Sequence, residues 1–346
     1  MKYTCTLINQ PWEDPGVLVR VNDTREYWLF DCGDLRNLSV GTMIDTTRVF
    51  ITHSHIDHFI GFDTLMRMNL RESKELVFFG PVGLAAQIGC RLQGYSWNLT
   101  EDSNFSIKCC ELEDTQVVSY LFRASNKFVE DIDDRRAHPL THPELRLGDG
   151  TMLRFAPLVH GVPCLCYSIT EPLQARIKKD EFAKSGLPSG AWIGKLLKIC
   201  SGQISEPHDI KVGDEVKTID ALRPLVYYPK PNRYAYVTDT VFNRDSMASI
   251  HWVGQGADEL WCEACYRHAE RDKAVQNFHL TARQVGRIAK ELQVDNLYMF
   301  HYSRRYREEL WPHIKEAREN FERTNIPPMT SLAHRHLLES GAMRES

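Results

Sequence analysis

The chain has 346 residues, of which 42% are hydrophobic and 25% are charged, and this composition excludes disordered, collagen-like and disulfide-framework proteins. Its 42 Lys and Arg against 46 Asp and Glu give a net charge of −4, so no global basic field attracts nucleic acid and any polyanion contact must be local. No stretch approaches the roughly 18 apolar residues of a membrane helix, and the first residues lack a secretory signal, so we expect a cytoplasmic protein with no membrane partner.

Short apolar runs separated by turn residues predict a strand-rich first third, followed by alternating strands and helices. The predicted strands are Val17–Val21, Tyr27–Asp31, Val49–Thr52, Leu76–Phe79, Met152–Leu158, Cys164–Ile169, Tyr234–Thr238, Leu260–Cys262 and Leu297–Phe300. Helices are predicted from about Val82 toward Leu92, from the N-cap Thr281 to about Leu292, and over Arg305–Arg323. A polar residue closely follows each strand from Met152–Leu158 onward, which is typical of a site built on strand ends.

The composition changes between Glu171 and Arg233. Six basic residues lie close together in the first half of this stretch, opposed only by Asp180 and Glu181: Arg176, Lys178, Lys179, Lys184, Lys195 and Lys198. Taken alone, this pattern favours a solvated helix and loop over a phosphate-binding segment.

After Pro327 and Pro328 no apolar face is evident, so we expect residues 329–346 to form a loose C-terminal tail.

The ten cysteines are too few for a disulfide framework. Cys262 and Cys265 have the CxxC spacing of a zinc knuckle or a redox motif, but no second CxxC or HxxxH pair accompanies them. Cys164 and Cys166 lie in an apolar run that reads as a strand. We therefore interpret both pairs as buried structural thiols.

A cluster of four metal-ligand residue types directly follows the predicted strand Val49–Thr52. His53, His55, Asp57 and His58 form the pattern HxHxDH. Alternation along an extended backbone points His53 and His55 to the same side, and the turn that follows can bring Asp57 and His58 to a second point nearby. So many ionisable groups at a strand end are costly unless a metal neutralises them. The cluster predicts two neighbouring divalent ions, preferably zinc, with manganese or iron as alternatives.

The HxHxDH cluster resembles the signature of the metallo-β-lactamase superfamily. This resemblance implies an α/β fold, a four-layer αβ/βα sandwich with metals at its strand ends, and we expect it to occupy residues 1–328 as one domain. It also implies seven ligands in two sets that share one bridging carboxylate: His53, His55 and His160 for one ion, Asp57, His58 and His301 for the other, and Asp239 for both.

Further segments resemble the ribonuclease Z family, which processes tRNA 3′ ends. Residues 301–306 (HYSRRY) resemble its HxSxRY ending, 278–282 (FHLTA) its H(S/L)TA segment, 261–265 (WCEAC) its HEAT-type segment and 29–34 (LFDCGD) its LFDCGE segment. Residues 185–198 resemble the Gly/Pro-rich arm that grips tRNA, so we expect a basic arm inserted at about 171–232, with phosphate contacts from Lys195 and Lys198. The LGTG-type opening is absent and Cys262 replaces the histidine of HEAT, which indicates a divergent branch.

The resemblance implies hydrolysis of pre-tRNA by two divalent ions, which lower the pKa of a water between them toward roughly 7 and offset the phosphate charge. Asp57 can orient this water as well as bind metal. His279 is the candidate general acid, and Glu263 is expected to hold its other ring nitrogen. Arg305 is a candidate phosphate contact, with a structural ion pair as the alternative.

Two other functions use the same residues. A small-molecule or cyclic-nucleotide phosphodiesterase would need the same metal site without an RNA-binding arm. A non-catalytic RNA-binding scaffold would keep the fold alone, and the complete set of seven ligands argues against it. The resemblance also implies a homodimer.

Overall fold

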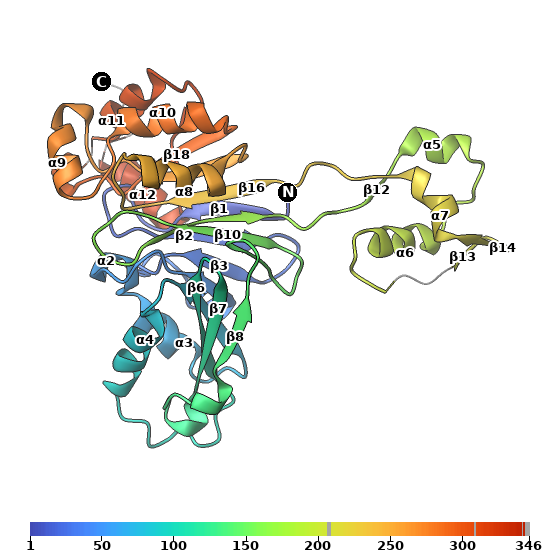
Figure 1. Cartoon of the computed structure of the whole chain (residues 1–346), viewed down its shortest axis with the longest axis horizontal. Coiled ribbons are helices and arrows are strands. Elements are labelled where there is room, and N and C mark those ends of the chain that lie inside the picture. Colours follow the sequence, from blue (N-terminus) through green and yellow to red (C-terminus); the bar gives the residue numbers. More distant parts are fainter. Residues whose placement is uncertain (206–208, 308, 341, 343–346) are drawn as a thin grey trace. The chain divides into compact units, whose positions relative to one another are not determined.

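The computed structural model describes residues 1–205, 209–307, 309–340 and 342, and these form two compact units (Figure 1). Unit 1 comprises Met1–Leu145, Leu153–Ile169 and Arg233–Ser346, and unit 2 comprises Arg146–Met152 and Thr170–Asn232. Unit 2 therefore contains the segment expected as an insertion at about 171–232. Among the described residues, no helix is both long enough and apolar enough to cross a membrane.

Two β-sheets form the centre of the fold. The first has eight strands, paired in chain order: β1 (Tyr3–Leu7), β2 (Val17–Val21), β3 (Tyr27–Phe30), β4 (Thr46–Phe50), β5 (Glu75–Gly80), β6 (Ser106–Glu113), β7 (Gln116–Arg123) and β8 (Arg136–Pro139). The second has seven, in the order β19 (Thr324–Asn325), β18 (Asn296–Phe300), β17 (Glu259–Glu263), β16 (Arg233–Val237), β11 (Leu165–Thr170), β10 (Met152–Pro157) and β9 (Glu144–Arg146). Strands β16, β17 and β18 are parallel neighbours, so their carboxyl ends meet at one edge.

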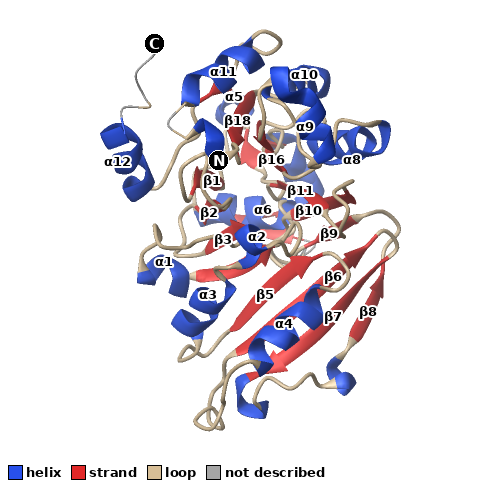
Figure 2. Ribbon diagram, turned by 90° about the vertical axis from the view of Figure 1, so that its left-hand side faces the viewer, coloured by secondary structure: helices blue, strands red, loops and turns tan. Residues whose placement is uncertain are grey.

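Helices pack on the outer face of each sheet (Figure 2). The first sheet is covered by α1 (Val40–Ile44), α2 (Ile56–Phe59), α3 (Phe62–Asn69) and α4 (Leu84–Gln93), and the second is accompanied by α8 (Arg244–Gly254), α9 (Arg271–Gln276), α10 (Ala282–Leu292), α11 (Leu310–Arg318) and α12 (Ser331–Ser340). Aromatic rings join the inner faces of the sheets, with the centroids of Phe30 and Tyr236 5.0 Å apart. The predicted four-layer αβ/βα sandwich is confirmed.

The helix predicted after Thr281 is present as α10. The Thr281 hydroxyl accepts a hydrogen bond from the backbone N–H of Gln284, whose side chain accepts one from the backbone of Thr281, forming a capping box. The helix predicted over 305–323 is shorter, because α11 begins at Leu310. Pro312 lacks a backbone N–H and is tolerated only in the first turn of a helix, so the helix cannot extend much further toward residue 305.

Part of the segment expected to be a loose tail is a helix, because Ser331–Ser340 form α12, while residues 341 and 343–346 lie outside the described residues. The backbone N–H of Leu7 donates to the carbonyl of Pro328 over 2.7 Å, which fixes the chain beside β1. Ala333 and Leu337 of α12 are fully buried, and Leu337 belongs to the core of the second sheet. The expectation was wrong because only two small or medium apolar residues face the core, while Leu332 and Leu338 beside them are exposed and blur the pattern.

Unit 2 has a hydrophobic core of its own. Its described residues form two antiparallel strand pairs and three α-helices: β12 (Arg176–Ile177) with β15 (Val226–Tyr227), β13 (Asp209–Val212) with β14 (Glu215–Thr218), α5 (Lys179–Lys184), α6 (Ala191–Cys200) and α7 (Ile219–Leu222). Trp192, Leu196 and Ile199 form the buried stripe of α6 within this core. Lys195 and Lys198 lie between these positions on the exposed face of the helix.

The buried histidine of α11, His313, makes the stability of unit 1 sensitive to pH. Its ring stacks on Tyr302 with centroids 4.1 Å apart, and neither ring nitrogen has a hydrogen-bond partner among the described residues. Burial, reinforced by the nearby Arg267, lowers the pKa of His313 to about 3. An unfolded histidine titrates near 6.5. The unfolded state therefore binds more protons between these values, and stability is lost as the pH falls through this window.

We expect His313→Phe, which keeps the stacked ring, to remove this pH dependence. The free energy of unfolding of the variant, taken relative to that of the unmodified protein, should be about 2 kcal/mol higher at pH 5 than at pH 8. Urea unfolding at the two pH values measures the difference. The exposed His334 provides the control, and an equal pH effect of His334→Phe would contradict the assignment to His313.

Candidate metal centre

The seven side chains expected to bind metal converge from segments that follow four strands, with Asp57 and His58 in helix α2 and the others in loops. His53, His55, Asp57 and His58 follow β4, His160 follows β10, Asp239 follows β16 and His301 follows β18. Because β16 and β18 flank β17 in a parallel arrangement, residues that follow them lie at the same edge of the sheet. The fold therefore places residues that are almost 250 positions apart in one site.

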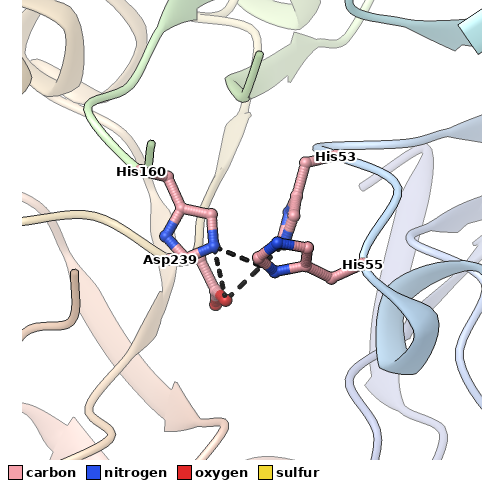
Figure 3. A group of neighbouring side chains, drawn as sticks. All are labelled: His53, His55, His160 and Asp239. Atoms are coloured by element: carbon pink, nitrogen blue, oxygen red, sulfur yellow. Dashed lines mark hydrogen bonds and ion pairs between the residues drawn. The ribbon is translucent and has the colours of Figure 1, made fainter. Parts of the chain in front are cut away.

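The first predicted set surrounds one point (Figure 3). Ligand atoms of His53, His55, His160 and Asp239 all lie within 4.8 Å of one another. Nε2 of His160 is 3.2 Å from Nδ1 of His55 and 3.5 Å from Oδ2 of Asp239, and Nε2 of His53 is 3.7 Å from the same oxygen. Such distances separate the ligands of one tetrahedral ion with bonds of about 2.0 Å.

The second predicted set also adjoins Asp239. Ligand atoms of Asp57, His58 and His301 lie within 4.8 Å of one another. Nε2 of His301 is 3.1 Å from Oδ1 of Asp239, and Nε2 of His58 is 3.5 Å from Oδ2. Asp239 thus contacts both sets, the position that a bridging carboxylate requires.

Whether this site suits a cation can be judged from two buried imidazole nitrogens. Nε2 of His53 and Nε2 of His58 are both buried and have no hydrogen-bond partner among the described residues. An unpaired buried polar atom costs about 1–3 kcal/mol. Both nitrogens lie within 4 Å of the Asp239 carboxylate, and imidazole with carboxylate is a donor set for divalent metals. The residues therefore fit divalent metal ions.

Asp31, in the LFDCGD segment, has no predicted role but orients one of the histidines. Its Oδ2 accepts hydrogen bonds from Nδ1 of His58 (2.9 Å) and from the hydroxyl of Tyr236 (3.0 Å), and its Oδ1 accepts from the backbone N–H of Thr52 (2.7 Å). With Nδ1 protonated, the lone pair of His58 is on Nε2, toward Asp239. A carboxylate behind a ligand imidazole fixes its tautomer in this way. The sequence signal that could have identified Asp31 was its position directly after a buried strand.

The backbone of the site is strained where strands end. Asp239 and His301 have φ values of 47° and 57°, in the left-handed region that residues other than glycine seldom adopt. Such conformations cost about 1–3 kcal/mol and persist where the surrounding structure holds them. Gly33 packs against the ligand loop so closely that an added Cβ would lie 2.6 Å from the carbonyl oxygen of Asp57. The turn after β3 therefore requires glycine.

The charges of the site prepare its side chains for metal binding. Burial raises the pKa of Asp239, but His301 and His58 outweigh it and hold the pKa well below its ordinary value. Burial and the neighbouring His58 lower the pKa of His53. At neutral pH Asp239 is therefore ionised and His53 is neutral, which are the forms that bind metal.

The predicted general acid and its partner lie beside the predicted metal ligands. Nδ1 of His279 is 2.9 Å from Oε2 of the fully buried Glu263, whose Oε1 accepts hydrogen bonds from the backbone N–H groups of Thr240 and Leu280. Burial lowers the pKa of His279, but Glu263 and the Cys265 thiol outweigh it and raise the pKa well above its ordinary value. The ring lines a cavity of about 270 Å³ shared with the metal ligands, so a protonated imidazole faces the space where substrate would lie.

Arg305 does not line this cavity. Its guanidinium is 2.6 Å from Oε1 of Glu270 and lies over the ring of Tyr266, which corresponds to the structural ion pair considered as the alternative. The neighbouring Arg304 lines the cavity instead, 3.2 Å from Asp14. Lys195 and Lys198 belong to unit 2, and the seven predicted ligands belong to unit 1.

The four cysteines of the two pairs noted in the sequence differ in their surroundings. Cys164, Cys166 and Cys262 are buried in the core of the second sheet, as interpreted from the sequence. Cys265 differs, because it lines the cavity beside His279.

Comparison with known proteins agrees with this geometry. No protein-family model matches the chain. The chain is 29% identical over 322 residues to ribonuclease Z of Deinococcus radiodurans, covering 91% of this chain and 94% of that protein, and 26% identical over 323 residues to ribonuclease Z of Methanosarcina acetivorans, covering 88% and 87%.

Solved structures show the same fold. The metallo-β-lactamase fold protein YhfI of Bacillus subtilis has a TM-score of 0.56 at 16% identity, and the short form of human tRNase Z has a TM-score of 0.52 at 16% identity. Each comparison covers 94% of this chain and 96% of the other. The chain has the metallo-β-lactamase fold, and its sequence is similar over most of its length to those of proteins named ribonuclease Z.

Proposed function

We propose that this chain is a metal-dependent endoribonuclease of the ribonuclease Z type that removes the 3′ trailer from pre-tRNA. The observation that carries the proposal is the convergence of two ligand sets on Asp239, with the His279–Glu263 pair beside them. The relatives named ribonuclease Z match the chain over most of its length and support RNA as the substrate class.

The proposed cofactors are two zinc ions, with manganese or iron as alternatives. Five imidazoles and two carboxylates supply the ligands, and an imidazole-rich set suits zinc better than magnesium or calcium: His53, His55 and His160 for one ion, Asp57, His58 and His301 for the other, and Asp239 for both. When bound, the ions supply Lewis-acid chemistry, lowering the pKa of water and offsetting the negative charge of the phosphate.

The side chains around the metal centre orient the water, donate the proton and contact the phosphate. Asp57, whose carboxylate is partly exposed to the cavity, orients the attacking water as well as binding metal. His279 donates a proton to the leaving 3′ oxygen, and Glu263 holds Nδ1 so that the other nitrogen is available for that transfer. Arg304, on the wall of the cavity, is a better candidate for a phosphate contact than Arg305.

A comparison of substrates tests the proposal. Metal-loaded protein is incubated with a transcript carrying a 3′ trailer, with cyclic AMP and with bis(p-nitrophenyl) phosphate. Cleavage of the transcript just after the discriminator base supports a tRNA-processing enzyme. Hydrolysis of cyclic AMP without transcript cleavage would instead identify the small-molecule phosphodiesterase, and inactivity on all three with metal bound would identify a scaffold.

Unit 2 is proposed as the arm that binds the body of the RNA. Lys195 and Lys198 share the exposed face of α6, and no ion pair involves either of them within the described chain, whereas Lys184 pairs with Glu181. Two unpaired cations on one helix face suit consecutive phosphates of a polynucleotide. Their chemistry favours an RNA substrate over a small diester.

We expect Lys195→Gln/Lys198→Gln to weaken binding of pre-tRNA on the order of tenfold and to flatten its dependence on salt concentration, because each lost phosphate contact reduces the slope by about one. Filter binding and cleavage assays over a salt series measure both effects. Hydrolysis of bis(p-nitrophenyl) phosphate should be unchanged. The matched control, Lys211→Gln/Lys217→Gln, removes the same charge from the same unit, and an equal loss in both variants would contradict a specific role for α6.

Replacing the whole arm gives an independent test. The backbone N–H of Glu171 donates to the carbonyl of Asn232 over 2.9 Å, so a short turn can join these residues after removal of 172–231. This variant should lose pre-tRNA cleavage and keep activity toward the small diester.

The homodimer and the cytoplasmic location stay predictions. Light scattering of the purified protein measures whether it is a dimer.

A further inference from the structure

We propose that Glu263, Cys265 and His279 form a third cation site that binds a thiophilic divalent ion such as zinc and thereby inhibits the enzyme. The binding part of this inference stands on the residues alone. The inhibitory part rests on the function proposed above, in which His279 is the general acid.

The three side chains are arranged as a ligand set. One ligand atom from each lies within 4.8 Å of the others. Oε2 of Glu263 is 2.9 Å from Nδ1 of His279, and Sγ of Cys265 belongs to the same group of neighbouring ligand atoms. Thiolate, imidazole and carboxylate are the three ligand types that zinc accepts in four-coordinate sites, and a water can complete such a set.

Strand alternation explains why this set forms. Glu263 ends β17 and Cys265 follows two positions later, so their side chains lie on the same side of the backbone. Cys262 and Ala264 point the other way, into the core of the second sheet. The CxxC spacing therefore does not make a two-cysteine knuckle, and His279 takes the place of the second cysteine.

An ion can reach this set without passing through the core. Cys265 and His279 both line the cavity of the metal centre, although Cys265 is only 7% exposed. Nδ1 of His279 is 4.0 Å from Oδ1 of Asp239, so the third position is close to the proposed metal centre. Repulsion between neighbouring cations weakens its affinity, and we expect occupancy only when the ion exceeds two equivalents per chain.

Occupancy changes what His279 can do. The incoming ion takes the Nδ1 lone pair and the Glu263 oxygen, and the protons of Nδ1 and of the Cys265 thiol leave to solvent. Glu263 then no longer holds the imidazole in the orientation for proton donation. Excess zinc therefore inhibits cleavage without removing the two ions of the metal centre.

Cobalt absorption tests the site directly, because none of the seven ligands of the proposed metal centre contains sulfur. Protein loaded with two equivalents of Zn²⁺ is titrated with Co²⁺, and zinc retention is checked by elemental analysis. A thiolate-to-cobalt charge-transfer band should appear in the unmodified protein and in Cys90→Ser, which removes an exposed cysteine, and be absent from Cys265→Ser and Cys265→Ala. No band in the unmodified protein, or an undiminished band without Cys265, overturns the proposal.

An inhibition assay tests the consequence. The excess of Zn²⁺ that halves transcript cleavage should be about tenfold higher or more for Cys265→Ser than for Cys90→Ser, since loss of a supporting group alone weakens metal binding 10–100-fold. Equal sensitivity of the two variants would overturn the inhibitory role. If the protein cleaves no RNA, the proposed function fails, while the charge-transfer band still decides whether the cation site exists.

Discussion

Asp239→Asn should weaken metal binding at both positions and remove nearly all phosphodiester hydrolysis. Its Oδ1 is 3.1 Å from Nε2 of His301, and its Oδ2 is 3.5 Å from Nε2 of both His160 and His58, so the carboxylate adjoins both predicted ligand sets. An amide supplies only one oxygen and no charge, so it cannot bridge two cations. We expect activity to fall on the order of 10³-fold or more, because the Lewis-acid contribution to both water and phosphate is lost.

Metal content and turnover measured on the same preparation check this result. Elemental analysis after dialysis should give two ions per chain for the unmodified protein and one or fewer for Asp239→Asn. Asp272→Asn is the matched control, because that side chain is 97% exposed. If Asp239→Asn retained two tightly bound ions and full turnover, the assignment of Asp239 as the bridging ligand would be wrong.

The local part of the site could be predicted from sequence because it is encoded in consecutive residues. His53, His55, Asp57 and His58 are adjacent along the chain, and strand alternation followed by a turn is enough to place them together. His160, Asp239 and His301 required the resemblance as well, since nothing in a single histidine or aspartate tells which strand end it shares. The sheet order supplies that information, because β18 and β16 lie on either side of β17.

Other features depend on which way one side chain points, which a pattern does not decide. Arg304 and Arg305 lie in the same single turn of 3₁₀ helix, where successive side chains diverge by about a third of a turn. Only one of two equivalent arginines can then face the cavity. Glu111 of β6, for which no role was predicted, is buried and accepts hydrogen bonds from the backbone N–H groups of Gly83 and Ala85.

Removal of the proposed general acid should separate proton donation from metal binding. We expect His279→Gln to lower turnover of pre-tRNA about 10²- to 10⁴-fold, the contribution of a positioned acid, while two metal ions remain bound. The reason is the leaving group: a ribose 3′ oxygen must be protonated as it departs, whereas p-nitrophenolate leaves without a proton. Hydrolysis of bis(p-nitrophenyl) phosphate should therefore fall much less.

Kinetics on the two substrates, with metal analysis of each variant, measure this separation. Glu263→Gln should show the same selectivity with a smaller loss, about 10- to 100-fold, because it disturbs the orientation of His279 rather than removing it. The exposed His138 supplies the control, and His138→Gln should match the unmodified protein on both substrates. Equal losses on both substrates for His279→Gln would mean that the imidazole supports the metal centre, and the proton would then have to come from another group on the cavity wall.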